Sequence, residues 1–313
     1  MPEVVEVFLT SQYLNFKIKD CEVTKISILG GRYSRHPMKG LETFKKDLPV
    51  KILSINNKGK FMWFECEKGS KKYYILNRFG LEGKWSFIKE KHSNVEFEIK
   101  DKDKFYHLYF TDSRNFGTME ITNNKRDLDK ELEKLGPDFL KESFDSKILY
   151  KRIESILKPN KLVRGEKEII KVLMDQSSKT GLGSGLGNYL GVEALFYAKI
   201  SPHTKIGDLF KDKKKIALLS KSIKYVLRLA LMTANIGYLE GLEPDFDKYV
   251  EKLRKEIEND KNHKFNFHQD VNIKNKKFSF KVYRQKEDPF GNEVKADKII
   301  SGRTTYWSPK IQN

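Results

Sequence analysis

The residues at the start of the chain can do chemistry. The sequence opens Met1-Pro2-Glu3. If the initiator methionine is removed, as a small second residue allows, Pro2 has a free secondary amine with an ordinary pKa of ~7.7–8.0, so part of it is neutral and nucleophilic near pH 7. Such an amine forms a charged iminium with an aldehydic carbon, and Glu3 can transfer protons beside it. A frayed chain start is the alternative interpretation.

A second candidate lies in Asn57-Lys58-Gly59-Lys60. Gly59 allows the backbone to approach another group closely, and Lys60 opens a strongly apolar segment that is typical of a strand. An ammonium group there can bind a phosphate or assist a leaving base. A strand-edge lysine without a chemical role is the alternative.

The third candidate is the glycine-rich run from Gly181 to Tyr189. Its glycines recur at every second position and follow a helical segment, so it does not match the dinucleotide-binding fingerprint. The pattern favours the start of a helix, with Asn188 near the cap and backbone amides directed at an anion such as a phosphate. A flexible connection between two helices is the alternative.

The fourth candidate is Arg303, in the segment Ser301–Trp307. Gly302 before it and the hydroxyls of Thr304 and Thr305 after it indicate the tip of a β-hairpin. Arginine in this position suits bidentate contact with a phosphate.

The charge of the chain favours a polyanionic partner. Lys and Arg number 61 against 43 Asp and Glu, a formal net charge of +18. Each phosphate that a basic side chain neutralises releases counterions and adds affinity. Lysine, asparagine and isoleucine are abundant throughout, however, and AT-rich coding DNA would produce the same bias whatever the function.

Other features of the composition narrow the class of protein. The two cysteines, Cys21 and Cys66, lack metal-ligand spacing and are expected to be buried thiols. No segment approaches the ~18 apolar residues of a membrane helix, and the start lacks the layout of a signal peptide. We therefore expect an intracellular protein that acts wherever its polyanion is.

The spacing of apolar residues changes along the chain. From residue 4 to about 125 they mostly alternate with polar ones, as at Val95, Phe97 and Ile99, which predicts an antiparallel β-sandwich. Helical spacing follows, and β spacing returns after Phe278. The predicted segments are helices at 128–135, 147–157, 166–176, from 189 and at 213–236, strands at 278–282 and 303–307, and a turn at 288–292.

The fold class predicted from this order is α+β. We expect a β-sandwich domain over 1–130, a linker over 131–146, a helical domain over 147–270 and a terminal hairpin over 271–313. The hairpin is too small to have a core of its own.

In order along the chain, the four candidates resemble the formamidopyrimidine-DNA glycosylase / endonuclease VIII (Fpg/Nei) family. The opening Pro2-Glu3-Val4-Val5-Glu6-Val7 is similar to the family's Pro-Glu-x-Pro-Glu-Val start, although Val5 replaces the second proline. The resemblance implies that Pro2 is the nucleophile, that Glu3 is the acid-base carboxylate with Glu6 in support, and that Lys60 is the catalytic lysine of a β-hairpin.

Two further stretches resemble the family's loops that fill the gap left by an everted nucleotide. Arg78-Phe79-Gly80-Leu81-Glu82-Gly83 and Asp112-Ser113-Arg114-Asn115-Phe116-Gly117 assign this use to Leu81, Arg114 and Phe116. An apolar wedge and a stacking ring would offset lost base stacking while arginine pairs the orphaned base. Leu81 replaces the family's methionine, a change that conserves volume.

The later motifs resemble the family's helix-two-turn-helix and finger. The resemblance implies that Lys171 and Asn188 bind phosphates flanking the lesion and that Arg303 binds DNA from the finger. Where zinc-bearing members have cysteines, this chain has Phe290, Glu293, Ser308 and Ile311. The expected finger is therefore zincless, with no metal and no cofactor.

The implied activity is that of a bifunctional DNA glycosylase and abasic-site lyase with β,δ-elimination. Because the stretch 241–270 is rich in Glu and Lys, and helix-like where 8-oxoguanine enzymes have a lesion-capping loop, we expect oxidised pyrimidines, hydantoins and abasic sites as substrates. The expected partner is damaged DNA, duplex or single-stranded, bound by a monomer. A non-catalytic DNA-binding relative and a basic RNA-binding or packaging protein are the alternatives. An AT-rich genome such as that of a giant DNA virus would account for the residue bias.

Overall fold

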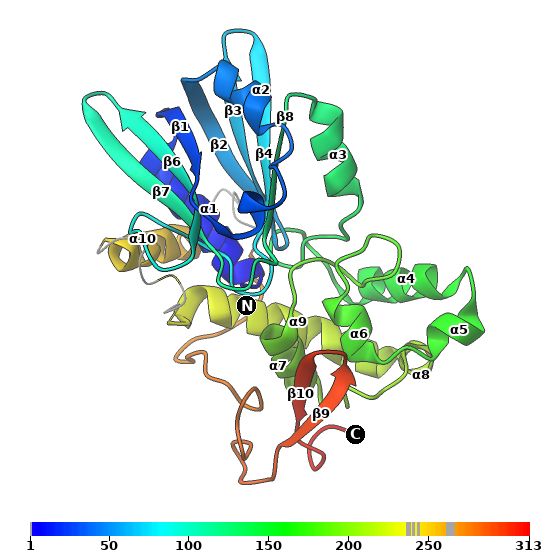
Figure 1. Cartoon of the computed structure of the whole chain (residues 1–313). Coiled ribbons are helices and arrows are strands. Elements are labelled where there is room, and N and C mark those ends of the chain that lie inside the picture. The colour runs from blue at the N-terminus through cyan, green and yellow to red at the C-terminus, as the bar shows by residue number, and fades with distance from the viewer. Residues whose placement is uncertain (1, 236–238, 240–241, 243–244, 261–266) are drawn as a thin grey trace. The chain divides into compact units, whose positions relative to one another are not determined.

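The computed structural model describes residues 2–235, 239, 242, 245–260 and 267–313. They divide into two compact units, which are described separately below (Figure 1). Unit 1 comprises Met1–Glu133 and Ile236–Lys255, and unit 2 comprises Lys134–Asn235 and Glu256–Asn313. The four-part division of the chain at 130, 146 and 270 stays a prediction.

Unit 1 begins with helix α1 (Val4–Ile18), where a β pattern was expected, so the prediction is wrong for this segment. Val4, Val5 and Val7 are fully buried, and the buried apolar residues of the segment do not keep to one face of the helix. Such a segment shows no helical stripe, and its β-branched residues resemble a strand. The signal for a helix was the pair Glu3 and Glu6, which form a reciprocal capping box at its start.

The remainder of the β region forms one antiparallel sheet of eight strands, in the order β5-β7-β6-β1-β2-β3-β4-β8. These strands are β1 (Glu22–Ile28), β2 (Val50–Lys58), β3 (Phe61–Lys68), β4 (Lys71–Arg78), β5 (Lys84–Ser86), β6 (Ser93–Asp101), β7 (Lys104–Thr111) and β8 (Thr118–Thr122).

The sheet folds into two layers at β1, which pairs with β6 along its length but with β2 only at Glu22 and Val23. Buried aromatic rings fill the space between the layers. Trp85 of β5 lies 5.2 Å from the ring of Phe64 in β3, and its indole Nε1 donates to Asn77 of β4. The predicted α+β fold with an N-terminal antiparallel sandwich is therefore confirmed.

Short helices complete unit 1. They are η1 (Gly31–Ser34), α2 (Leu41–Lys46), α3 (Lys125–Glu133) and α10 (Phe246–Glu258). The rings of Phe246 and Tyr249 in α10 lie 5.1 and 5.4 Å from that of Tyr13 in α1, and the hydroxyl of Tyr13 donates to Asp245. A helix was expected within 241–270. It is present as α10, while 241, 243–244 and 261–266 lie outside the described residues.

Unit 2 is mainly helical, as predicted. Its helices are α4 (Ser146–Leu157), α5 (Lys161–Gly165), α6 (Ile169–Met174), α7 (Asn188–Ala198), α8 (Ile206–Lys211) and α9 (Lys213–Thr233). Position 236, the last residue of the helix expected at 213–236, lies outside the described residues. No described helix is both long enough and apolar enough to cross a membrane.

The chain ends in the predicted hairpin, formed by β9 (Lys295–Ile300) and β10 (Arg303–Trp307). The strand predicted at 278–282 is wrong, because those residues have no regular secondary structure. Their alternating apolar side chains form a cluster of aromatic rings, and their backbone amides bond to a carboxylate, as described below.

Candidate active site and nucleic-acid interface

In unit 1, buried polar side chains join α1 to β2. Asn15 accepts from the backbone N–H of Ile55 at 2.8 Å, and Ser11 donates to Asn57 at 3.2 Å. From Asn15 back to Ser11 is four residues of helix, and from Ile55 on to Asn57 is two residues of strand. Both steps cover about 6 Å, so the helix and the strand run in opposite directions at this contact. The start of α1, with Pro2 and Glu3, therefore lies at the end of β2 where the turn to β3 begins (Figure 1).

That turn contains Lys60. Lys58 pairs with Phe61 in the register of β2 and β3, so Gly59 and Lys60 form a two-residue turn. Gly59 has a φ of 53°, in the left-handed region that favours glycine. The buried Asn57 donates from Nδ2 to the Gly59 carbonyl at 3.2 Å. Through Asn57, the turn is hydrogen-bonded indirectly to α1.

The two predicted gap-filling loops lie at the same end of the sheet. Phe61 pairs with Arg78, and Arg78 pairs with Thr118, so the β4–β5 loop leaves and the β7–β8 loop returns where the Lys60 turn lies. A Cβ atom on Gly80 would lie 2.5 Å from the backbone nitrogen of Gly117, so the loops touch. Unit 1 therefore gathers Lys60 and both loops at one end, where α1 also begins.

The β7–β8 loop is held from inside by Asp112. Its carboxylate accepts from the N–H of Gly117 at 2.6 Å and from that of Arg114 at 3.2 Å. The guanidinium of Arg114 lies 5.4 Å from the ring of Phe116, which is 54% exposed. Leu81 on the other loop is half-buried. An exposed ring and an arginine beside a partly exposed leucine suit insertion into a base stack.

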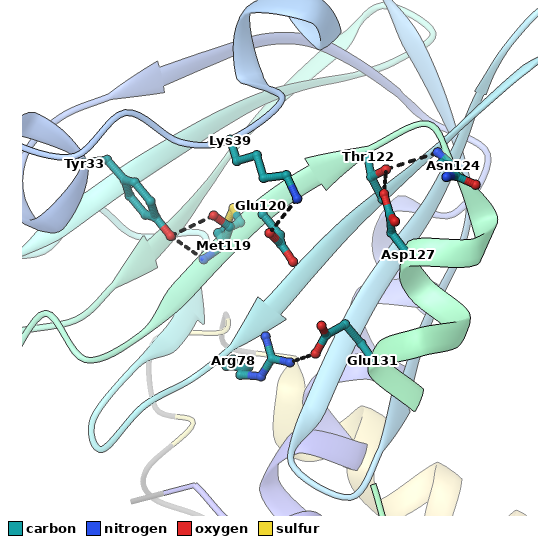
Figure 2. Close-up of polar contacts among 9 residues, drawn as sticks. All are labelled: Tyr33, Lys39, Arg78, Met119, Glu120, Thr122, Asn124, Asp127 and Glu131. Carbon is teal, nitrogen blue, oxygen red and sulfur yellow. Dashed lines mark hydrogen bonds and ion pairs between the residues drawn. The ribbon is translucent and has the colours of Figure 1, made fainter. Parts of the chain in front are cut away.

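Arg78, the first residue of the Arg78–Gly83 motif, has defined contacts of its own. Figure 2 shows it paired with Glu131 of α3, among polar contacts that fix β4, β8 and α3. In the same region, Tyr33 donates to the Met119 carbonyl at 2.9 Å. The guanidinium of Arg78 also lies 5.0 Å from the ring of Phe61, the residue after Lys60. Arg78 therefore adds a second cation to the Lys60 end of the sheet.

In unit 2, the glycine-rich run before α7 is fixed by hydrogen bonds. Arg152 donates to the Gly181 carbonyl and to two neighbouring carbonyls, and Gln176 accepts from the N–H of Gly185 at 2.6 Å. A Cβ on Gly183 would lie 2.7 Å from the Phe139 ring. These contacts favour the interpretation of the run as an ordered helix start, and not as a flexible connection between two helices.

Asn188 is the first residue of α7, and it contacts the hairpin. Its Nδ2 donates to the Thr304 carbonyl at 2.8 Å, and its Oδ1 is buried without a partner among the described residues. Thr304 follows Arg303, which pairs with Ile300 across the two-residue turn Ser301-Gly302. Unit 2 therefore brings Asn188 and Arg303 together.

Lys171 has different surroundings. It forms an ion pair with Glu168 at 2.9 Å, and Glu168 also pairs with Lys205 at 3.1 Å. Burial acts to raise the pKa of Glu168, but hydrogen bonds from Lys171, the backbone and Lys205 outweigh it and lower the pKa to about 2. Lys171 is 43% exposed, and no contact described for it joins it to Asn188 or Arg303.

Two buried carboxylates, both missed by the sequence analysis as functional positions, hold the irregular chain beside the hairpin. Glu193 of α7 accepts from the N–H groups of Lys281, Val282 and Tyr283 at 2.9 to 3.0 Å. Burial raises the pKa of Glu193, and these amides oppose the rise. The only signal in the sequence is a glutamate among the apolar residues of a segment expected to be a helix.

Asp288 is the second of these carboxylates. It accepts from the N–H groups of Phe290 and Asn292, from the Asn292 side chain and from the hydroxyl of Ser308 at 2.7 Å. Ser308 is one of the four positions where zinc-bearing relatives were expected to have cysteine. Among the described residues, no cluster of three or more His, Cys, Asp or Glu could hold a metal ion.

Comparison with known proteins matches three parts of the chain to one family. Family models of formamidopyrimidine-DNA glycosylase match its N-terminal domain to residues 1–119, its H2TH domain to 135–239 and its C-terminal domain to 269–313. The formamidopyrimidine-DNA glycosylase of Lactococcus lactis subsp. lactis (strain IL1403) is 29% identical over 238 residues, 74% of this chain and 78% of the relative. That of Bacillus subtilis (strain 168) is 29% identical over 237 residues, with the same coverage of 74% and 78%.

Solved structures share the fold. A complex of L. lactis Fpg with THF-DNA and an inhibitor has a TM-score of 0.71 at 24% identity, with 100% of both chains covered. A complex of L. lactis Fpg with DNA containing Fapy-dG has a TM-score of 0.70 at 24% identity, covering 99% of this chain and 100% of that one. With matching models for all three domains and this fold, the chain belongs to the formamidopyrimidine-DNA glycosylase family.

Proposed function

We propose that the protein is a bifunctional DNA glycosylase and abasic-site lyase of base excision repair. The observation that supports this most strongly is the register of unit 1. It gathers the turn with Lys60 and the loops with Leu81, Arg114 and Phe116 at the end of the sheet where α1 begins. A nucleophile, a cation and an intercalating pair of loops are the groups that excision of an everted base requires.

In the proposed first step, the Pro2 nitrogen attacks C1′ of the damaged nucleotide. The bond from C1′ to the base breaks, the sugar ring opens, and the amine proton is lost as the iminium forms. Protons are needed on O4′ and on the departing base, and Glu3, next to Pro2, is placed to deliver one of them. Lys60 assists the leaving base or binds a flanking phosphate.

The iminium then drives strand cleavage because it withdraws electrons from the sugar. Loss of a C2′ proton expels the 3′ phosphate, and loss of a further proton expels the 5′ phosphate, which gives β,δ-elimination. Water releases the sugar fragment from Pro2 and restores the amine.

The other candidate residues bind DNA in this proposal. Leu81, Arg114 and Phe116 fill the gap left by the everted nucleotide, and Asn188, Lys171 and Arg303 contact phosphates. Damaged DNA is the partner of a monomeric enzyme that acts in the compartment where the DNA is. Oxidised pyrimidines, hydantoins and abasic sites are the proposed substrates, and formamidopyrimidines, which the relatives' name indicates, belong in the same substrate panel.

Borohydride trapping tests the proposed nucleophile. Reduction converts the iminium into a stable bond, so the protein should become attached to DNA with an abasic site. A variant with one uncleaved residue before Pro2 is the sharpest comparison, because it converts the amine into an amide and leaves every side chain unchanged. It should lose trapping completely.

Pro2→Gly is the matched control, since it keeps an α-amine and should keep part of the trapping. Mass spectrometry of each variant establishes whether Met1 has been removed. Undiminished trapping by the extended variant would place the nucleophile elsewhere, with Lys60 the first residue to substitute.

A further inference from the structure

A cluster of five aromatic rings lies beside the Asn188–Arg303 pair in unit 2. We call it the aromatic platform. The ring centroids of neighbouring members are 5.1 to 6.2 Å apart, and Phe280 is 41% exposed. Its members are Tyr189, Phe278, Phe280, Tyr283 and Tyr306.

The platform is held in one conformation although most of it lies outside helices and strands. Glu193 binds the N–H groups of Lys281, Val282 and Tyr283, and Phe278 donates its N–H to Thr233 at 2.7 Å. Phe280 lies between these two anchors. A ring presented on a fixed backbone loses little conformational entropy when it binds.

The surroundings of the platform are cationic. Between Val271 and Lys286 the sequence has no acidic residue, and it has six basic ones: Lys274, Lys276, Lys277, Lys281, Arg284 and Lys286. Arg284 lies 5.4 Å from the ring of Tyr283. Exposed rings among cations are the combination that binds single-stranded nucleic acid, because bases stack on the rings while the backbone follows the charge.

Two neighbours connect the platform to the proposed DNA contacts. Tyr189 follows Asn188 at the start of α7, and Tyr306 lies in the same strand as Arg303. A strand whose phosphates contact Asn188 and Arg303 would therefore pass the platform. In intact duplex DNA the faces of the bases are covered by their neighbours, so a ring that is not inserted between base pairs can stack only on an unpaired base.

We propose that the aromatic platform, with Phe280 as its exposed ring, stacks unpaired bases of single-stranded DNA next to the lesion. This rests on the proposed function and adds to it a capacity to engage damage in unpaired DNA, such as bubbles and single strands. Stacking is indifferent to sequence, so the platform accepts any base.

Binding of a labelled oligo(dT) without a lesion tests the platform separately from catalysis. Phe280→Ala should weaken the affinity for oligo(dT) by about tenfold, the typical loss of one base stack. Because no charge changes, the salt dependence should stay as in the wild type. Cleavage of a lesion in duplex DNA should proceed at the wild-type rate, while cleavage of the same lesion in a single strand should slow.

Three variants keep the result interpretable. Phe280→Tyr keeps a flat ring and should restore binding, whereas Phe280→Leu keeps apolar packing without a ring and should behave as Phe280→Ala. Phe290→Ala removes a ring that is 73% exposed but outside the platform, and it should bind oligo(dT) normally.

Two results would overturn the proposal. One is unchanged oligo(dT) binding by Phe280→Ala, and the other is an equal loss on duplex and single strand. If the wild type cleaved no lesion, the proposed function would fail, but oligo(dT) binding would still decide for or against the platform.

Discussion

The two units hold their candidate residues by different means. In unit 1, the sheet register and the hydrogen bonds of Asn15, Ser11 and Asn57 between α1 and β2 position the turn with Lys60. The candidate residues are therefore placed by regular secondary structure. In unit 2, two buried carboxylates, Glu193 and Asp288, hold irregular chain around the hairpin by accepting backbone N–H groups.

The difference indicates how each unit should respond to substitution. Unit 1 groups that would face the reacting sugar should change the rate of chemistry. Unit 2 groups should change affinity, because they order the surface that meets phosphates. A buried carboxylate with several amide donors is also a strong clamp, since charge-assisted hydrogen bonds are worth roughly twice neutral ones.

The largest effect expected is in unit 1, from Glu3→Gln. Base removal should fall by about 10² or more, because the amide cannot deliver the proton that the sugar or base needs. Cleavage at a preformed abasic site should fall much less, since that substrate has already lost its base. Single-turnover rates on the two substrates measure both, and equal losses would contradict the role given to Glu3.

In unit 2, Asp288→Ala should raise the Kd for duplex DNA by about tenfold or more. The substitution removes the charged acceptor of the Phe290 and Asn292 N–H groups, and a hydrogen bond to a charged group contributes about 1.5–3 kcal/mol. The hairpin with Arg303 should then lose its order. Fluorescence anisotropy at several salt concentrations gives the Kd, and the single-turnover rate at saturating protein should remain near that of the wild type.

Glu287→Ala is the matched control for Asp288→Ala, because it removes the same charge from an exposed neighbour. If Asp288 acts through Arg303, the double variant with Arg303→Ala should bind no more weakly than the weaker single variant. Fully additive losses would show that the two residues act independently.

A smaller loss is expected from Asn57→Ala, which breaks the link from α1 to the Lys60 turn. We expect a decrease of about tenfold in cleavage rate, in the range that misplacing a catalytic group by a fraction of an ångström produces, with DNA affinity unchanged. Asn56→Ala on the same strand is the control, since its side chain bonds to Ser54 instead. If Asn57→Ala lowered DNA affinity but not the cleavage rate, the inference that unit 1 sets the rate and unit 2 the affinity would be wrong.

Much of this arrangement could be predicted from sequence, where local pattern and tertiary environment agree. The alternating residues of β6 and the apolar stripe of α9 gave the correct elements. Helix α1 did not, because its apolar residues are spread around the helix and lack the periodicity that distinguishes a helix from a strand. The segment 278–282 had the reverse problem, since its alternation comes from ring packing and not from a strand ladder.

The positioning residues were harder to find than the candidate site residues. Glu193 acts on backbone N–H groups that are distant in sequence, since Lys281 lies 88 positions away. Asn57 and Asp288 bond to backbone groups two to four residues away, and their distant partners are the hydroxyls of Ser11 and Ser308. No motif encodes such contacts, because any residue can supply an N–H or a carbonyl.

His268 provides a test of unit 2 by pH. It is 2% exposed, lies T-shaped on the Phe144 ring at 5.3 Å, and its Nε2 donates to the Phe139 carbonyl at 2.6 Å. Burial lowers the pKa of His268 to about 4, with Lys224 and Arg228 contributing and the carbonyl and Asp270 opposing. Its ordinary pKa, which we assign to the unfolded chain, is about 6.5.

As the pH falls below about 6.5, His268 is protonated in the unfolded chain but stays neutral in the folded unit. The free energy of unfolding therefore decreases until the pH reaches about 4. Between pH 7 and pH 5 this amounts to about 2 kcal/mol. Glu168 does not contribute there: its pKa is lowered to about 2, so its stabilisation is lost only under more acidic conditions.

Urea unfolding at the two pH values measures the change, and His268→Gln, which keeps a donor to Phe139 but cannot titrate, should remove most of it. An undiminished pH dependence in that variant would assign the proton uptake to other groups and leave His268 as a packing residue alone.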